Sequence, residues 1–385
     1  MLDVRNYIAS FSNYRNIMPK STFIVRAPGR LSVMGGHVDY NGGPVLPIAI
    51  PLHIELHLEP HSGNTVELYA EEIDKHAQFS LDDLQHQHSW IDYVQGVAVE
   101  LKELGIPLRG FRGVVKSTLP MAAGLSSSAA LEVATALAFL HLANESLSPV
   151  ETALLSQRAE NKFVGVQCGI LDQTAIAACI ADHALLLYCN TMEFEQIPFD
   201  LKHHSMIVTY SGAPRELASS AYNDRRASCE KAVEILQNEL PQISQLCDLN
   251  PDDLPLAEKV LSPLLYKRVR HVVTEIDRTK RAAIALKSND LETLGKLIDQ
   301  THNSLRDDYE VSSKELNWLV DWARKQPGVL GSRLTGAGFG GCTVTLMEKE
   351  QIAPFMQSLP LEYKSFSGID AECWEVNAVD GARVL

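Results

Sequence analysis

Pro120–Ala130, with the sequence PMAAGLSSSAA, is the segment whose residue types best suit phosphate chemistry. It lies between an apolar run, Phe111–Lys116, that predicts a strand, and a longer one, Ala129–Ala143, that predicts a helix. A small-residue turn that opens onto a helix N-terminus offers free backbone N–H groups, the positive end of the helix dipole, and hydroxyl groups. No lysine follows Gly124, so the segment is not a Walker A loop. A helix cap without a binding role would have the same sequence features. The other segments of the chain therefore have to distinguish a phosphate loop from a simple cap.

Three other polar segments supply the remaining groups that a phosphoryl-transfer site needs. Arg30 precedes a glycine-rich loop at Gly35–Asn41, Glu160 and Asp172 accompany expected helices, and a second glycine-rich loop lies at Gly336–Gly341. Each of these features alone also has a simpler explanation: a surface arginine, carboxylates that are solvated or cap a helix, and an ordinary turn. Phosphoryl transfer requires a phosphate cradle, oxygen ligands for Mg²⁺, a cation near the transferred group and a carboxylate near the acceptor hydroxyl. The four segments together match this requirement, so we interpret them as one site.

The composition is that of a globular protein that acts on small molecules. At 385 residues the chain exceeds the size at which one hydrophobic core keeps growing, which predicts two domains. The formal net charge of −14 argues against nucleic acid or an anionic membrane as a partner. Seven scattered cysteines without a C-x-x-C pair indicate neither a disulfide framework nor a zinc site. Without a signal-peptide pattern or a membrane-length apolar run, we expect a cytoplasmic protein.

Hydrophobic periodicity predicts strands and helices in both halves of the chain. The expected strands are Thr22–Arg26, apolar strands on either side of a glycine-rich loop within Gly29–Ile50, His53–Glu59, Thr65–Glu71, Phe111–Lys116, Ala184–Tyr188, Met206–Tyr210, Thr343–Thr345 and Cys373–Val376. The expected helices are Trp90–Leu104, Ala129–Ala143, Ser148–Val164, one that begins at Cys168, Leu217–Leu240, Leu264–Leu286, Leu291–Arg306 and Ser312–Lys325. Ser148 and Glu151 can form a capping box at the third of these helices. A polar turn at Phe199–His204 marks the expected boundary between domains 1–200 and 201–385, and the irregular mixture predicts an α+β fold.

Three motifs resemble those of the GHMP small-molecule kinases, and more narrowly those of the galactokinase branch. The first, sugar-binding motif is similar to APGRLSVMGGHVDYNGG, the phosphate loop to LPMAAGLSSSAALEVAT, and the third motif to LTGAGFGGCTVTL. The intervening segments AENKFVGVQCGILDQ, ELASSAYNDRRASCE and HNSLRDDYEVSSKEL also resemble galactokinase segments. The similarity therefore extends over about residues 22–346, and the combination points to the galactokinase branch.

The resemblance implies a two-domain fold whose active site lies in the cleft. The N-terminal domain would be like ribosomal protein S5 domain 2 and the C-terminal domain ferredoxin-like, with ATP, Mg²⁺ and a sugar as ligands. Asp172 would face the anomeric hydroxyl of the sugar with Arg30 beside it, and these are the implied catalytic residues. Ser128 and Glu160 would hold Mg²⁺. The implied sugar contacts are His37, Asp39, Gly169 and Tyr222, and the implied ATP-phosphate contacts are Gly124, Leu125, Ser126, Ser127, Ser128, Gly336, Gly338 and Gly340.

Gly36 departs from the pattern of the family, which has a glutamate there that receives the C6 hydroxyl of the sugar. Glycine removes that acceptor and leaves room. The Gly-Gly pair also resembles the motif of plant L-arabinokinases, whose substrate lacks a C6 group, and a galacturonate carboxylate would no longer be repelled. A galactokinase-type sugar 1-kinase that makes galactose 1-phosphate is the first expectation, with L-arabinose or galacturonate as alternative substrates.

Two further alternatives concern the class of protein. A different GHMP kinase, acting on mevalonate or homoserine, would not be expected to carry HVDYNGG and AYNDRR. A galactose sensor that binds sugar and ATP without catalysis would be expected to have a damaged phosphate loop, whereas GLSSSAA and Asp172 are both present. The role of Asp172 is open between a base that accepts the proton late and a group that mainly orients the hydroxyl.

Overall fold

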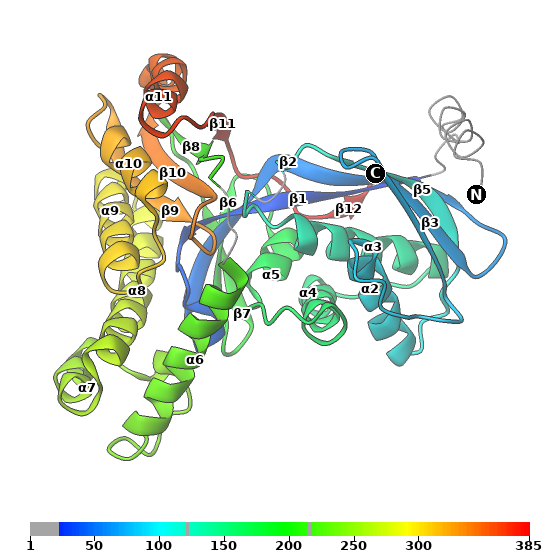
Figure 1. Cartoon of the computed structure of the whole chain (residues 1–385), viewed down its shortest axis with the longest axis horizontal. Helices are drawn as coiled ribbons and strands as arrows, with labels where there is room; N and C mark the ends of the chain where they lie inside the picture. The colour runs from blue at the N-terminus through cyan, green and yellow to red at the C-terminus, as the bar shows by residue number, and fades with distance from the viewer. Residues whose placement is uncertain (1–22, 121–122, 214–217) are drawn as a thin grey trace.

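The computed structural model describes residues 23–120, 123–213 and 218–385. Within them, the strands form an eight-stranded and a four-stranded sheet (Figure 1). The strands of the larger sheet are β1 (Phe23–Met34), β2 (Pro44–Pro60), β3 (Thr65–Ala70), β4 (Lys75–Ser80), β5 (Phe111–Ser117), β6 (His183–Tyr188), β7 (Glu193–Pro198) and β12 (Arg383–Val384). Those of the smaller sheet are β8 (His204–Tyr210), β9 (Val329–Thr335), β10 (Cys342–Glu348) and β11 (Glu372–Val376).

Helices cover one face of each sheet (Figure 1). Those of the larger sheet are α2 (Ile91–Glu103), α3 (Ser127–Ala143), α4 (Pro149–Arg158), the π-helical segment η2 (Ala159–Val164) and α5 (Leu171–Ala178). Those of the second half are α6 (Ala218–Leu236), α7 (Leu254–Val260), α8 (Pro263–Lys287), α9 (Leu291–Asp307), α10 (Lys314–Ala323) and α11 (Ile352–Ser367). Short 3₁₀ turns are η1 (Asp39–Asn41), η3 (Leu246–Asp248), η4 (Pro251–Asp253) and η5 (Lys349–Gln351).

The larger sheet has the order β12-β1-β2-β5-β3-β4, and β6 with β7 extends from the start of β2. The two longest strands of this sheet, β1 and β2, form a hairpin. A register shift at Pro28/Gly29 accommodates the proline inside β1. Gly29 has no room for a side chain, because an added Cβ would lie 2.5 Å from Leu119 Cδ2 and 2.9 Å from Leu125 O. The phosphate loop therefore packs directly on β1, one residue before Arg30.

One of the apolar clusters spans both sheets. Buried side chains of β1 and β2 belong to the same hydrophobic cluster as those of β8, β10, α8 and α9. The chain leaves the larger sheet after β7, builds the four-stranded sheet, and returns as β12 to pair with β1, where the C-terminus lies (Figure 1). The change of sheet between Pro198 and His204 agrees with the polar turn at Phe199–His204, while the boundary at residues 200/201 stays a prediction.

The α+β fold with two parts is confirmed, and most expected elements appear within a few residues of their predicted bounds. The Ser148–Glu151 capping box is present. All seven cysteines are free. No helix in the described ranges is long and apolar enough to cross a membrane. Thr22, Leu217 and residues 121–122 of the serine-rich turn lie outside the described residues.

Several expectations about secondary structure were wrong in detail. The strand expected at Thr22–Arg26 and the one expected from Gly29 are a single strand that ends at Met34, because the bulge at Pro28/Gly29 lets the sheet pass through the proline. The helix expected from Ser148 to Val164 changes from α to π at Ala159, and the one expected at Cys168 begins only at Leu171. The strands β4 and β7 and the helices α7 and α11 were not predicted, and α11 contains Pro360.

Candidate active site

Arg30 and Asp172 form a two-pronged ion pair between β1 and the first turn of α5. Arg30 Nε lies 2.6 Å from Asp172 Oδ1 and Arg30 Nη2 lies 2.8 Å from Oδ2. The arginine side chain is only 8% exposed, whereas that of Asp172 is 31% exposed. The guanidinium thus fixes the orientation of the carboxylate, and the carboxylate still reaches solvent where an acceptor hydroxyl can approach it.

The phosphate loop is anchored through its carbonyl groups. Arg30 donates from Nη1 to Gly124 O at 2.8 Å and from its backbone N–H to Leu125 O at 3.3 Å. Ser126 adopts a left-handed conformation with φ of 65° and donates its hydroxyl to Asp172 Oδ2. The backbone N–H groups of Gly124–Ser128 have no partner among the described residues. With its carbonyls bound inward, the loop presents these amides at the N-terminus of α3, which suits an anion.

The second glycine-rich loop, between β9 and β10, packs against the phosphate loop. A Cβ on Gly336 would lie 3.0 Å from Gly124 O, and the thiol of Cys342 donates to Ala123 O at 3.2 Å. Gly336, Gly338 and Gly340 all have positive φ, and a Cβ on Gly338 would lie 2.2 Å from Val311 O. Only glycine fits at Gly338 beside Val311. The contacts of Gly336 and Cys342 with the phosphate loop indicate that the second loop supports it from behind.

Glu160 lies within hydrogen-bond reach of Ser128 because a π-helical turn carries it inward. The six-residue π-helix η2 follows α4 directly, and Glu160 is buried at its start. Burial raises the pKa of Glu160 to about 7, against hydrogen bonds from Cys168 and Ser128 that lower it. Ser127, by contrast, is exposed at the first residue of α3. The expected pair of oxygen ligands, Ser128 and Glu160, is therefore brought together.

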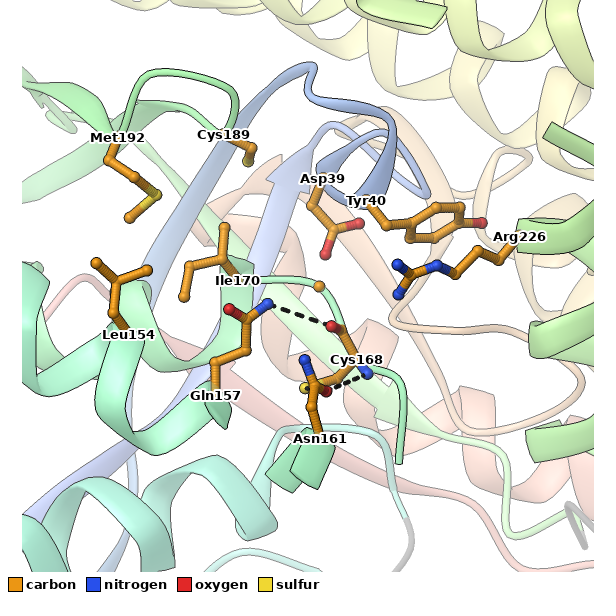
Figure 2. Close-up of a pocket in the computed structure, with 11 residues that line it drawn as sticks. Asp39, Tyr40, Leu154, Gln157, Asn161, Cys168, Ile170, Cys189, Met192 and Arg226 are labelled. Atoms are coloured by element: carbon orange, nitrogen blue, oxygen red, sulfur yellow. Dashed lines mark hydrogen bonds between the residues drawn. The ribbon is translucent and has the colours of Figure 1, made fainter. Parts of the chain in front are cut away.

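Asp39 and Gly169 are in direct contact, at a pocket of about 200 Å³. A Cβ on Gly169 would lie 1.7 Å from Asp39 Oδ2, so only glycine leaves room for the carboxylate. Figure 2 shows the Asp39 side chain directed into the pocket, opposite Cys168 and Ile170. Burial, with the nearby charge of Asp172 as the next cause, raises the pKa of Asp39 to about 6.

His37 is bound through both ring nitrogens. Its Nε2 lies 3.1 Å from Ala337 O, which can only accept, so Nε2 carries the proton and Nδ1 accepts from the Tyr40 hydroxyl at 2.9 Å. Tyr40 in turn accepts from Tyr309 at 2.7 Å. Burial, helped by His271, lowers the pKa of His37 to about 3, so the ring is neutral. This chain of hydrogen bonds, from Tyr309 to Ala337, ties η1 to the second glycine-rich loop.

Tyr222 on α6 completes the aromatic side of the site. Its ring centre lies 5.5 Å from that of His37 and 5.3 Å from that of Tyr40. Burial, followed by the charge of Asp39, raises its pKa well above the usual value for tyrosine. The Tyr222 hydroxyl is therefore protonated and able to donate. Arg225, on the same helix, fixes α6 to the segment after α9 by donating to Tyr309 O at 2.7 Å.

Gly36 lies beside the guanidinium group of Arg333 and the methyl groups of Leu305. Its φ lies outside the left-handed region, and an added Cβ would lie 3.4 Å from Arg333 Nη1 and from both methyl groups of Leu305. Arg333 is buried and donates from Nε to Val33 O at 3.1 Å. The backbone at Gly36 thus accepts other residues, and what distinguishes this position is the missing side chain.

The sequence-predicted residues thus gather around one site, and the sequence reasoning missed their supporting partners. These are Tyr40, Glu132, Gln173, Arg333 and Tyr309. Tyr40 and Gln173 stand next to predicted residues in the sequence, which was the only signal available for them. Glu132 carried one as well, since it is a carboxylate within the apolar run of α3.

Comparison with known proteins identifies the family. Galactokinase from Roseiflexus sp. (strain RS-1) is 41% identical over 387 residues, which covers 100% of this chain and 98% of that protein. The chain belongs to the galactokinase family. Galactokinase from Chloroflexus aggregans is 42% identical over 370 residues, 96% of this chain and 94% of that protein. The family profiles agree: "GHMP kinases N terminal domain" matches residues 92–179, "Galactokinase galactose-binding signature" 12–60 and "GHMP kinases C terminal" 282–363.

Solved structures support the same assignment. Lactococcus lactis galactokinase complexed with galactose superimposes with a TM-score of 0.92 at 33% identity, over 98% of this chain and 99% of that one. Mevalonate kinase of Methanococcus jannaschii, with a TM-score of 0.64 and 20% identity over 94% of this chain and 100% of that one, shares the fold. The chain is therefore a GHMP kinase, a phosphotransferase with an alcohol group as acceptor, and its family uses ATP.

Proposed function

We propose that this galactokinase-family enzyme transfers the γ-phosphoryl group of ATP to the anomeric hydroxyl of galactose. The observation that carries the proposal is the Arg30–Asp172 pair, which contacts the phosphate loop through Gly124 O and Ser126 while Asp172 stays open to solvent. A carboxylate for the acceptor and a cation for the transferred group thus lie side by side. Relatives similar over the whole chain are galactokinases, which makes galactose the first substrate to test.

In this reaction the C1 oxygen of the sugar forms a bond to the γ-phosphorus as the bond to the β–γ bridging oxygen breaks and ADP leaves. If Asp172 is the base, it accepts the proton of the C1 hydroxyl. If Asp172 only orients this hydroxyl, the proton passes first to a neighbouring oxygen. Arg30 faces the negative charge that is spread over the transferred group. The free amides of Gly124–Ser128 bind the ATP phosphates at the N-terminus of α3.

Ser128 and Glu160 are the residues that would hold Mg²⁺. A hydroxyl and a carboxylate within hydrogen-bond reach of each other fit a cation that prefers oxygen ligands and shares its shell with substrate phosphates and water. Across the described ranges, no cluster of three or more His, Cys, Asp and Glu side chains could hold a metal alone, so the ATP phosphates must supply the rest. When bound, Mg²⁺ neutralises charge on the β- and γ-phosphates.

Asp39, Gly169, Tyr222 and His37 form the proposed sugar side of the site. Asp39 offers an acceptor for ring hydroxyls, and the protonated Tyr222 offers a donor. Because both ring nitrogens of His37 are already bound, its contribution to the sugar would come through its backbone and its ring face. A cytoplasmic location belongs to the same proposal and is supported by the seven free thiols.

The variant Asp172→Asn tests the assignment. We expect galactose phosphorylation to fall by at least about 10²-fold, since positioned acid–base groups contribute about 10²–10⁴-fold, with ADP binding within a few-fold of wild type. The assay follows ADP release with galactose, L-arabinose, galacturonate, N-acetylgalactosamine and glucose. If Asp172→Asn keeps more than about a tenth of the turnover, the chemistry lies elsewhere. If none of the sugars is used by the wild type, the proposed substrate class is wrong.

A further inference from the structure

Glu132 is a carboxylic acid at the centre of the helical layer. It lies on α3, one turn after Ser128, and is 0% exposed. Burial, with the charge of Glu160 as the next cause, raises its pKa well above the usual value. Its Oε2 accepts from Gln173 Nε2 at 3.1 Å, and its Oε1 has no partner among the described residues. A group so costly to bury requires a reason, and none of the reaction steps above uses it.

Gln173 connects this acid to the proposed metal ligand. Its Nε2 donates both to Glu132 Oε2 and, at 2.7 Å, to Glu160 Oε2. Two acceptor oxygens on one side, Glu132 Oε2 and Glu160 Oε2, determine which end of the amide faces them, because only the NH₂ group can donate. Gln173 Oε1 is buried and has no partner among the described residues, so no hydrogen bond of its own favours the flipped orientation.

One oxygen of Glu160 is occupied by protein donors. Oε2 receives the Gln173 amide at 2.7 Å and the Cys168 thiol at 3.2 Å. These two donors, whose Nε2 and Sγ atoms lie 3.7 Å apart, hold this oxygen in place on its π-helical turn. Oε1 receives neither of these donors and is therefore the Glu160 oxygen that remains for a cation.

We infer that Gln173, anchored by Glu132, is a positioning residue that presents Glu160 Oε1 to the divalent cation of the nucleotide. The inference rests on the proposed function, because it takes Ser128 and Glu160 as the cation ligands. Gln173 directly follows Asp172, so the same helical turn of α5 sets both the acceptor carboxylate and the orientation of the metal carboxylate. Partners that orient metal ligands in this way change metal affinity by about 10–100-fold when they are removed.

The test measures ADP binding by calorimetry without sugar, across a titration of Mg²⁺ and in EDTA. Gln173→Leu and Glu132→Leu should raise the Mg²⁺ concentration that half-maximally enhances ADP binding by about 10–100-fold, while ADP binding in EDTA stays within threefold. Glu132→Gln keeps an acceptor for Gln173 Nε2 and should restore the midpoint to within threefold of wild type. Thr135→Val, on the same helix with a buried hydroxyl that has no partner among the described residues, is the matched control.

The outcomes separate this inference from the assignment of the cation ligands. If Gln173→Leu binds ADP with the same Mg²⁺ midpoint as Thr135→Val, or if Glu132→Gln is as impaired as Glu132→Leu, the positioning role is refuted. If Mg²⁺ fails to enhance ADP binding in the wild type, the assignment of Ser128 and Glu160 fails first. Thermal unfolding identifies variants that merely fail to fold, and Glu132→Gln, which preserves the shape of the side chain, then gives the decisive comparison with wild type.

Discussion

Substituting Gly169 by alanine should disable the sugar side of the site without disturbing the fold. The φ of Gly169 lies outside the left-handed region, so alanine can adopt this backbone. Its Cβ, however, would lie 1.7 Å from Asp39 Oδ2 and 2.5 Å from Asp39 Cγ. That is roughly 1.5 Å closer than ordinary contact, so the carboxylate has to move by about that distance. A misplacement of about 1 Å can cost about 10²-fold, or about 2.7 kcal/mol at 1.36 kcal/mol per factor of ten.

The measurement is kcat/KM for galactose and, separately, ADP binding. We expect a loss of about 10²-fold in the first and less than threefold in the second, because the three atoms nearest to the added Cβ all belong to Asp39. Gly63→Ala is the control, since its Cβ would contact only His61, at 3.6 Å. Adding Asp39→Ala to Gly169→Ala should cost no more than Asp39→Ala alone, because both changes remove the same interaction. Additive losses, or a Gly169→Ala enzyme within threefold of wild type, would refute the reasoning.

Three further predictions concern the other parts of the site. Ser128→Ala and Glu160→Gln should weaken the Mg²⁺ dependence of the reaction and depress turnover, and unchanged Mg²⁺ titration curves in both would remove them as ligands. Because the pKa of Asp39 is raised to about 6, the carboxylate gains a proton below that pH; the profile of kcat/KM for galactose should therefore contain a limb near pH 6, beside the limb near pH 7 expected from Glu160, and only the limb near pH 6 should vanish in Asp39→Asn. Gly36→Glu should raise the galactose-to-L-arabinose ratio of kcat/KM by about tenfold, since it restores an acceptor for the C6 hydroxyl; a wild type that uses galactose and ignores L-arabinose would contradict this.

The sequence was sufficient for the family, the α+β class and the catalytic candidates, because these depend on local motifs. The serine-rich turn predicted its helix, and the Ser148–Glu151 capping box predicted where α4 begins. The sequence did not predict that the helix switches to a π turn at Ala159, because no residue in Ala159–Val164 breaks a helical pattern.

Partners from distant segments were equally hidden from sequence reasoning. Glu132 reads as one charged residue in an apolar helix until the fold places Gln173 against it. Gly169 showed no requirement for glycine until Asp39, 130 positions earlier, was found to occupy the space of its Cβ. Interactions of this kind depend on how helices and loops meet, which residue types and spacing do not specify.

The return of the chain as β12 has a mechanical consequence. A protein whose two parts are joined by one linker can twist and bend about that linker in several ways. Here the polypeptide passes between the sheets twice, once between β7 and β8 and once between β11 and β12, and both strands that end the passage are hydrogen-bonded in the sheet they enter. The second crossing therefore adds a covalent constraint to the buried contacts that already join the two parts, such as Arg333 Nε to Val33 O, and it limits how far the two sheets can rotate relative to one another.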